Sequence, residues 1–145
     1  MKSYSLQTLS RVMNGSLLNA QGEVIVVTSG VSTDTRSITD GSLFVALVGE
    51  HFDAHNFLEE AGAAAALVVS NAENVPTDRP AIVVSDTLAA LQGLAQWYLA
   101  EELHHIPVIA ITGSNGKTCT KDMTRSVLAQ KFRAHATRGN WNNHI

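Results

Sequence analysis

The chain has 145 residues, of which 45% are hydrophobic, and a formal net charge of -3. This composition is typical of a globular protein with a sizeable core, built as one domain or as one small domain and part of another. The weak negative charge argues against binding to nucleic acids or anionic membranes, because both attract strongly basic surfaces.

The N-terminus and the cysteine content favour a cytoplasmic protein. Residues 1–12 contain no uninterrupted apolar run and no small-residue cleavage site, so we expect no secretion signal. No stretch approaches the roughly 20 apolar residues of a membrane span, and we expect no membrane insertion. Cys119 is the only cysteine, which excludes an intrachain disulfide and fits a reducing compartment. We expect a monomer.

Residues 1–103 alternate predicted strands and helices. Short apolar or β-branched runs, bounded by glycine, proline or polar residues, predict strands at 24–27, 43–48, 66–69 and 81–85. Helical spacing or composition predicts helices over 6–13, over 55–62 and from Thr87 onward. Prolines and polar residues predict a loop over 71–80.

The first and last of these helices have identifiable ends. Ser5 is the expected N-cap of the first helix, and Gly15 is its expected stop. Asp86 is the expected cap of the helix that begins at Thr87. The buried face of that last helix is expected to contain Leu88, Leu91, Ala95 and Tyr98.

Residues 107–145 open with an apolar segment, 107–112, whose lack of polar alternation is typical of a parallel strand covered on both faces. A helix that ends near Gln130 follows, with Met123 and Val127 expected to face inward. Strands alternating with helices predict an α/β fold, with one small domain over 1–103 and the start of a parallel-sheet domain over 107–145. The histidine pair between them is interpreted as a solvated linker, because no third metal ligand has suitable spacing.

The sequence TGSNGKT at 112–118 follows the apolar segment and opens the predicted helix, as a phosphate-binding loop does. Glycines let backbone N–H groups approach phosphate oxygens. Lys117 is expected to hold its cation against the β- and γ-phosphates, and the Thr118 hydroxyl is expected to bind Mg²⁺. The alternative is a strand–helix turn that binds nothing, since the general pattern has glycine where this chain has Ile111. The expected phosphate-binding residues are Gly113, Ser114, Asn115, Gly116, Lys117, Thr118 and Cys119.

This compact loop resembles that of the Mur ligases and of their relatives, the folylpolyglutamate synthases. Members of this superfamily use ATP to phosphorylate a substrate carboxylate, and an incoming amine then displaces phosphate to form an amide. The resemblance implies that the loop binds ATP with Mg²⁺ and that Lys117 and Thr118 are catalytic, with Thr118 as a metal ligand. Cys119 stands where family sequences commonly have a second threonine, which weakens any hydroxyl contact there.

The segments 33–36, 40–46 and 49–57 resemble the uridine-nucleotide-binding domain shared by the tripeptide-forming and the D-Ala-D-Ala-adding Mur ligases. Backbone groups and hydroxyls of the first segment suit the uracil edge, and the loop 50–53 is expected to close over the ribose and pyrophosphate. Without the resemblance, these segments are a turn with a surface charge pair and one face of a helix start, with His51 and His55. The resemblance implies these substrate-binding residues: Thr33, Thr35, Arg36, Glu50, His51, Phe52 and Asp53.

Two segments favour the D-Ala-D-Ala-adding branch. The first is FDAHNF at 52–57, because the tripeptide branch usually lacks this Phe-Asp-x-His order. The second is GNWNNHI at 139–145, which resembles a segment whose asparagines lie near the substrate's pyrophosphate. Asparagine amides donate to phosphate oxygens without adding charge, so Asn142 and Asn143 are expected to bind substrate. The alternative for this segment is an asparagine-rich turn.

The resemblance therefore implies an ATP-dependent ligase that joins D-Ala-D-Ala to UDP-N-acetylmuramoyl-tripeptide in peptidoglycan synthesis. It covers 1–145 but only the front part of such a ligase, so we expect an incomplete chain that is inactive alone. The alternatives are the tripeptide-forming ligase and a non-catalytic UDP-nucleotide-binding module. Folylpolyglutamate synthase is disfavoured, because a uridine-type N-terminal domain is not expected there.

Overall fold

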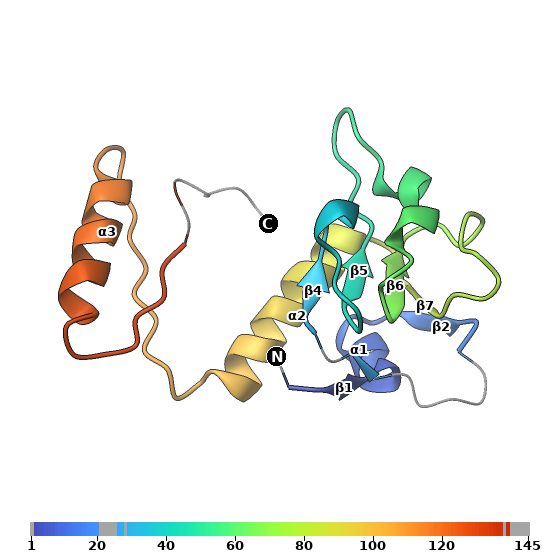
Figure 1. Cartoon of the computed structure of the whole chain (residues 1–145), viewed down its shortest axis with the longest axis horizontal. Helices are drawn as coiled ribbons and strands as arrows, with labels where there is room; N and C mark the ends of the chain where they lie inside the picture. The colour runs from blue at the N-terminus through green and yellow to red at the C-terminus, as the bar shows by residue number, and fades with distance from the viewer. Residues whose placement is uncertain (1, 21–25, 28, 138, 140–145) are drawn as a thin grey trace. The chain divides into compact units, whose positions relative to one another are not determined.

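The computed structural model describes residues 2–20, 26–27, 29–137 and 139 (Figure 1). Contacts within the chain divide it into two compact units, Met1–Glu102 and Leu103–Ile145, which are described separately. The first unit is a mixed α/β structure with a mostly parallel five-stranded sheet, which confirms the predicted fold class.

The sheet of the first unit has the order β2-β7-β6-β5-β4. Strands β4, β5, β6 and β7 are parallel neighbours, while β2 pairs antiparallel with β7 at one edge. Parallel neighbours need crossover connections, which the loops and helical turns between these strands supply. The strands are β2 (Ser16–Leu18), β4 (Val31–Ser32), β5 (Leu43–Val45), β6 (Ala66–Val69) and β7 (Ala81–Val83).

A separate two-stranded antiparallel sheet joins β1 (Tyr4–Ser5) to β3 (Val26–Val27). Of the strand predicted over 24–27, residues 24 and 25 lie outside the described part of the chain. The strand predicted over 66–69 is confirmed, whereas the other two are shorter than predicted. Strand β5 ends early because the chain turns into a hairpin at Val48.

The sheet separates two hydrophobic clusters, because successive side chains of a strand point to opposite faces. Helices α1 (Leu6–Val12) and α2 (Thr87–Glu102) cover one face (Figure 1). The 3-10 helices η2 (Ala54–Phe57) and η3 (Glu59–Ala61) cover the other. Phe44 is fully buried on this second face, and burial of such a side chain contributes about 1.5–3 kcal/mol.

Helix α1 begins as predicted and ends one residue earlier than predicted. The Ser5 side chain accepts a hydrogen bond from the Thr8 backbone N–H at 3.2 Å, as an N-cap does. Asn14, rather than Gly15, adopts the left-handed conformation that ends the helix, with φ of 51°. Asparagine tolerates this conformation better than most non-glycine residues, which is why a glycine stop is not required at this position.

The segment 55–62 is not the single α-helix that was predicted. It belongs to the two short 3-10 helices η2 and η3, which together begin at Ala54. The buried residues Ala54, Leu58 and Ala61 keep the spacing of three to four residues that suggested a helix. A segment this short gains little from α-helical hydrogen bonds of its own, so its contacts with the sheet decide its conformation.

Helix α2 begins as predicted, but its buried face is rotated. Asp86 Oδ1 accepts hydrogen bonds from the backbone N–H groups of Leu88 (2.8 Å) and Ala89 (2.9 Å). The buried residues of the helix are Thr87, Ala90 and Leu94. Of the residues predicted to be buried, Ala95 is exposed, and three are half-buried: Leu88, Leu91 and Tyr98. Helix α2 packs on the sheet through Ala90 and Leu94, so Ala95 lies to one side of this contact.

The second unit contains α3 (Lys117–Leu128), close to its predicted position. The strand predicted over 107–112 is wrong: no strand forms among the described residues from 103 onward, and a strand exists only through pairing. Met123 and Val127, which were predicted to face inward, are 70% and 71% exposed. The reason is the same, since no sheet lies against α3 within the described residues of this unit.

Candidate functional site

Two predicted substrate loops lie at the same edge of the sheet. The segment 33–37 follows β4, and the segment 46–54 follows the neighbouring strand β5. Because these strands are parallel, their carboxyl ends meet at one edge, which is where open α/β sheets bind ligands. Ser70, the residue after β6, belongs to the same edge. The topology therefore brings together loops that are separate in the sequence.

The first loop is a 3-10 turn, η1 (Thr35–Ser37), capped by Asp34. Asp34 Oδ1 accepts hydrogen bonds from the backbone N–H (3.0 Å) and Nε (2.9 Å) of Arg36, and Oδ2 accepts one from Nη2 (2.7 Å). The guanidinium and then the backbone N–H of Arg36 lower the pKa of Asp34 to about 2. The Arg36 side chain is still 87% exposed. Thr33 and Thr35 are half-buried, so all three predicted ligand residues of this loop are accessible.

The second loop is a hairpin over residues 48–53, called here the β5 hairpin. A hydrogen bond of 2.7 Å from the Gly49 N–H to the Phe52 carbonyl closes it, and its two ends form a β-bridge. Glu50 and His51 form its exposed tip. In Figure 1 the hairpin is the teal loop that extends beyond the end of β5. Both tip residues were predicted to bind substrate, and both face solvent.

Phe52 presents an aromatic surface beside this tip. Its side chain is 57% exposed and stacks on Phe57, with ring centroids 5.3 Å apart and an angle of 10° between the rings. Offset stacking of this kind holds an aromatic side chain in one orientation. The exposed side of the ring offers an apolar surface to a ligand that lies along the hairpin.

The Asp53 side chain makes hydrogen bonds within the fold. Its Oδ1 accepts a hydrogen bond from the His55 backbone N–H (2.9 Å) and lies 2.6 Å from His55 Nδ1. These backbone and side-chain hydrogen bonds lower the pKa of Asp53. On the other side of the ring, His55 Nε2 accepts the backbone N–H of Ser70 at 2.9 Å.

His55 is a residue of this edge that the sequence analysis left outside the site. The alternative without the resemblance placed it on one helix face with His51, but His51 is exposed and His55 is only 5% exposed. The available signal was the Asp-x-His spacing, because an aspartate two residues before a turn residue often caps its backbone N–H.

The glycine loop before α3 has the backbone geometry of an anion site. Gly113 and Gly116 have φ angles of 149° and 77°, which residues other than glycine rarely adopt. Lys117 Nζ donates a hydrogen bond to the Gly113 carbonyl at 2.6 Å, which brings its cation across the loop. Gly116, the N-cap of α3, supplies no side-chain cap. The first backbone N–H groups of α3 thus lack a side-chain acceptor and face the position where helices bind anions.

Thr118 and Cys119 are exposed on the first turn of α3. Mg²⁺ usually keeps several waters and takes one or two protein oxygens together with phosphate oxygens, so the Thr118 hydroxyl fits as one such ligand. In the part of the chain that the structure describes, no group of three or more His, Cys, Asp or Glu could hold a metal ion. That part includes His104 and His105, whose rings lie 5.4 Å apart in an edge-to-face arrangement.

Known proteins are similar to this chain along most of its length. The Mur ligase middle domain matches residues 111–145. The UDP-N-acetylmuramoyl-tripeptide--D-alanyl-D-alanine ligase of Bacillus subtilis (strain 168) is 46% identical over 144 residues, which are 97% of this chain and 31% of that protein. The chain belongs to the Mur ligase family.

Solved Mur ligase structures have the same fold. MurF from Acinetobacter baumannii superposes with a TM-score of 0.86 at 34% identity. The match covers 99% of the present chain and 31% of the Acinetobacter chain. MurF ligase from Thermotoga maritima in complex with ADP gives a TM-score of 0.67 at 31% identity, over 80% of this chain and 27% of that chain. This chain therefore spans a minor part of the length of the relatives that it matches.

The remaining predicted site residues of this Mur ligase chain, Asn142 and Asn143, lie outside the described residues. No helix in the described part of the chain is long and apolar enough to cross a membrane.

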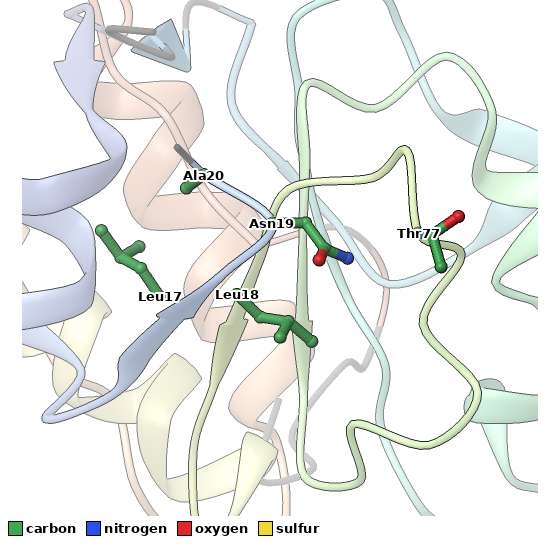
Figure 2. Close-up of a pocket in the computed structure, with 5 residues that line it drawn as sticks. All are labelled: Leu17, Leu18, Asn19, Ala20 and Thr77. Carbon is green, nitrogen blue, oxygen red and sulfur yellow. The ribbon is translucent and has the colours of Figure 1, made fainter. Parts of the chain in front are cut away.

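A hollow of the first unit lies away from the predicted loops. It has a volume of about 560 Å³ and is lined by Leu17, Leu18, Asn19, Ala20 and Thr77 (Figure 2). Asn19 Nδ2 donates to the carbonyls of Pro76 and Arg79, both at 3.2 Å, so this amide fastens the loop 71–80 to β2. None of the described lining residues is charged to meet a nucleotide's phosphates, so we do not assign the candidate site to this hollow.

Proposed function

We propose that this chain forms part of an ATP-dependent ligase that joins D-Ala-D-Ala to UDP-N-acetylmuramoyl-tripeptide in peptidoglycan synthesis, releasing ADP and phosphate. The glycine loop before α3 carries the proposal, because an uncapped helix N-terminus and the Lys117 ammonium meet there. The 46% identity to a UDP-N-acetylmuramoyl-tripeptide--D-alanyl-D-alanine ligase supports the choice of substrates. ATP is available in the cytoplasm, where we propose that the reaction takes place.

The phosphates of ATP are proposed to bind at the N-terminus of α3. Lys117 Nζ, which donates to the Gly113 carbonyl, would turn to a β- or γ-phosphate oxygen, and the loop from Gly113 to Cys119 would donate its backbone N–H groups. Bound Mg²⁺ would neutralise phosphate charge, with the Thr118 hydroxyl as its protein ligand. Lys117 then stabilises negative charge on the γ-phosphoryl group during its transfer to the tripeptide carboxylate.

The uridine nucleotide is proposed to bind in the N-terminal domain, 1–103, at the carboxyl edge of β4 and β5. The hydroxyls of the η1 loop suit the uracil edge, and the exposed guanidinium of Arg36 suits an anionic group. The β5 hairpin would close over the ribose and pyrophosphate. The ATP site would then belong to a second domain that begins at 107. The proposed substrate contacts are Thr33, Thr35, Arg36, Glu50, His51, Phe52, Asp53, Asn142 and Asn143.

Calorimetry with ATP and Mg²⁺ on matched lysine variants tests this proposal. Lys117→Ala removes a charge-assisted hydrogen bond, which is worth about 1.5–3 kcal/mol, so ATP binding should weaken tenfold or more. Lys131→Ala removes the same charge from an exposed lysine above Phe132 and should leave ATP binding unchanged. Both variants should bind the uridine nucleotide like the wild type. Equal ATP affinity in Lys117→Ala and wild type would contradict the assignment.

A further inference from the structure

The imidazole of His55 is buried, yet both of its nitrogens have partners. Nδ1 lies 2.6 Å from Asp53 Oδ1, and Nε2 lies 2.9 Å from the backbone nitrogen of Ser70 and 3.3 Å from its Oγ. A backbone N–H only donates, so Nε2 must be an acceptor and therefore carries no proton. Nδ1 then holds the proton and donates it to the Asp53 carboxylate, which fixes one neutral tautomer of the ring.

These hydrogen bonds join two different parts of the sheet edge. Asp53 is the last residue of the β5 hairpin, and its partner in the hairpin's β-bridge is Val48. Ser70 follows β6, the strand beside β5. The ring of His55 thus ties the base of the hairpin to the carboxyl end of a neighbouring strand. A backbone hydrogen bond of 3.0 Å, from the Ala54 N–H to the Leu47 carbonyl, also holds the hairpin to the chain that leaves β5.

The order Ser70, His55, Asp53 resembles a nucleophile, a base and an orienting carboxylate, but it does not have that chemistry. A base must offer a free lone pair to the serine hydroxyl. The Nε2 lone pair is already directed to the Ser70 backbone N–H at 2.9 Å, while Oγ lies farther away at 3.3 Å. The arrangement therefore holds structure and does not activate a nucleophile.

We infer that His55 is a positioning residue for the uridine nucleotide: it fixes the β5 hairpin so that the hairpin's exposed tip meets the ligand. The inference rests on the proposed function for the ligand's identity, and on the geometry of the edge for the role of His55. Glu50 and His51 are both exposed at the tip, so their direction depends on how the hairpin's base is held. Holding them before the ligand arrives reduces the ordering cost of binding.

Three substitutions at position 55 separate the two hydrogen bonds. His55→Ala removes both. His55→Asn keeps a donor near the position of Nδ1, toward Asp53, and His55→Gln keeps an acceptor near the position of Nε2, toward Ser70. Leu9→Ala is the matched control, because Leu9 is fully buried in the cluster on the opposite face, and its truncation lowers stability without touching the hairpin.

The first measurement is native-state amide exchange at Gly49 and Ala54, whose N–H groups close the hairpin and hold it to β5. His55→Ala should speed exchange at these two amides about tenfold, with Asn and Gln giving intermediate rates and Leu9→Ala leaving both close to wild type under native conditions. The second is calorimetry with UDP-N-acetylmuramoyl-tripeptide, for which His55→Ala should weaken binding about tenfold, as expected for the loss of ordering hydrogen bonds.

Unchanged exchange at both amides in His55→Ala would overturn the positioning role, whatever ligand the edge binds. Faster exchange with unchanged nucleotide affinity would also overturn it, since the hairpin's order would then not matter for binding. Failure of the wild-type chain to bind the nucleotide would instead remove the proposed function, and the exchange measurement would still decide whether His55 holds the hairpin.

Discussion

Asp34 and Arg36 show how two charges two residues apart shape the loop after β4. The carboxylate of Asp34 holds both the backbone N–H and the guanidinium of Arg36. Because the pair is exposed, water and salt screen its attraction, and its contribution to the stability of the fold is small. Its effect is local: it fixes the turn after β4 and so sets the direction in which Arg36 leaves the backbone.

We predict that Asp34 titrates at about 2, and that Arg36→Ala returns its pKa toward the ordinary value of 3.8. A carboxyl whose folded-state pKa is lowered stabilises the fold fully above its unfolded pKa, and this contribution disappears as the pH falls through the folded pKa. The effect of Arg36→Ala on stability should therefore be present at neutral pH and vanish near pH 2. Carboxyl carbon shifts in an NMR titration measure the pKa directly.

Arg36→Lys is the control for this titration. Lysine keeps the charge but not the paired hydrogen bonds of the guanidinium, so the pKa of Asp34 should lie between those of the wild type and Arg36→Ala. If Asp34 titrated at the same pH in all three proteins, the hydrogen bonds from Arg36 would not be the cause of its lowered pKa.

The glycine loop and the residue His55 differ in how far the sequence could predict them. The geometry of the glycine loop was predictable because its determinants are local: glycines with positive φ, a lysine and the start of a helix all lie within 113–118. The role of His55 was not, because its second partner, Ser70, lies 15 residues away and is brought near only by the pairing of β5 with β6.

Among the strands, prediction succeeded where the strand pairs with a neighbour in its own unit. The apolar run 66–69 is a central strand, as its sequence indicates. The equally apolar run 107–112 forms no strand, because none of the described residues of its unit pairs with it. Apolar periodicity indicates which residues need a partner, but the partner itself must be supplied by the fold.

The join between α1 and the sheet gives a test at the scale of elements. A Cβ built on Gly15 would overlap Ile82 Cγ2 and lie 2.9 Å from Val84 Cγ1 and 3.0 Å from the Val83 carbonyl. Gly15→Ala should therefore lower the free energy of unfolding by about 1–3 kcal/mol through overpacking of this stiff strand. Urea denaturation followed by circular dichroism measures the change.

Gly93→Ala is the matched substitution for this measurement. Gly93 lies within α2, and a Cβ there meets nothing within 4 Å. Alanine should stabilise the helix by about 0.5–1 kcal/mol, since glycine is costly inside helices. Opposite signs for the two alanine variants are expected. A Gly15→Ala protein as stable as the wild type would show that the turn at Gly15 does not pack tightly against β7.

For the molecule as a whole, the two units carry different kinds of loop. The first unit has its proposed ligand loops at the carboxyl edge of β4 and β5, with hydroxyls, an exposed arginine and an aromatic ring. The second unit has a glycine loop at an uncapped helix N-terminus, with a lysine across it. These two chemistries suit a nucleotide sugar and a nucleoside triphosphate, which are the two nucleotides of the proposed reaction.

Residue-resolved NMR titration of the wild-type chain with each nucleotide in turn tests this division most directly. UDP-N-acetylmuramoyl-tripeptide should shift the amides of 33–36 and 49–53 and leave 113–119 unchanged. ATP with Mg²⁺ should shift the amides of 113–119 and leave the first two segments unchanged. If both nucleotides shifted the same residues, or if neither shifted the segment assigned to it, the account of two separate nucleotide sites would be wrong.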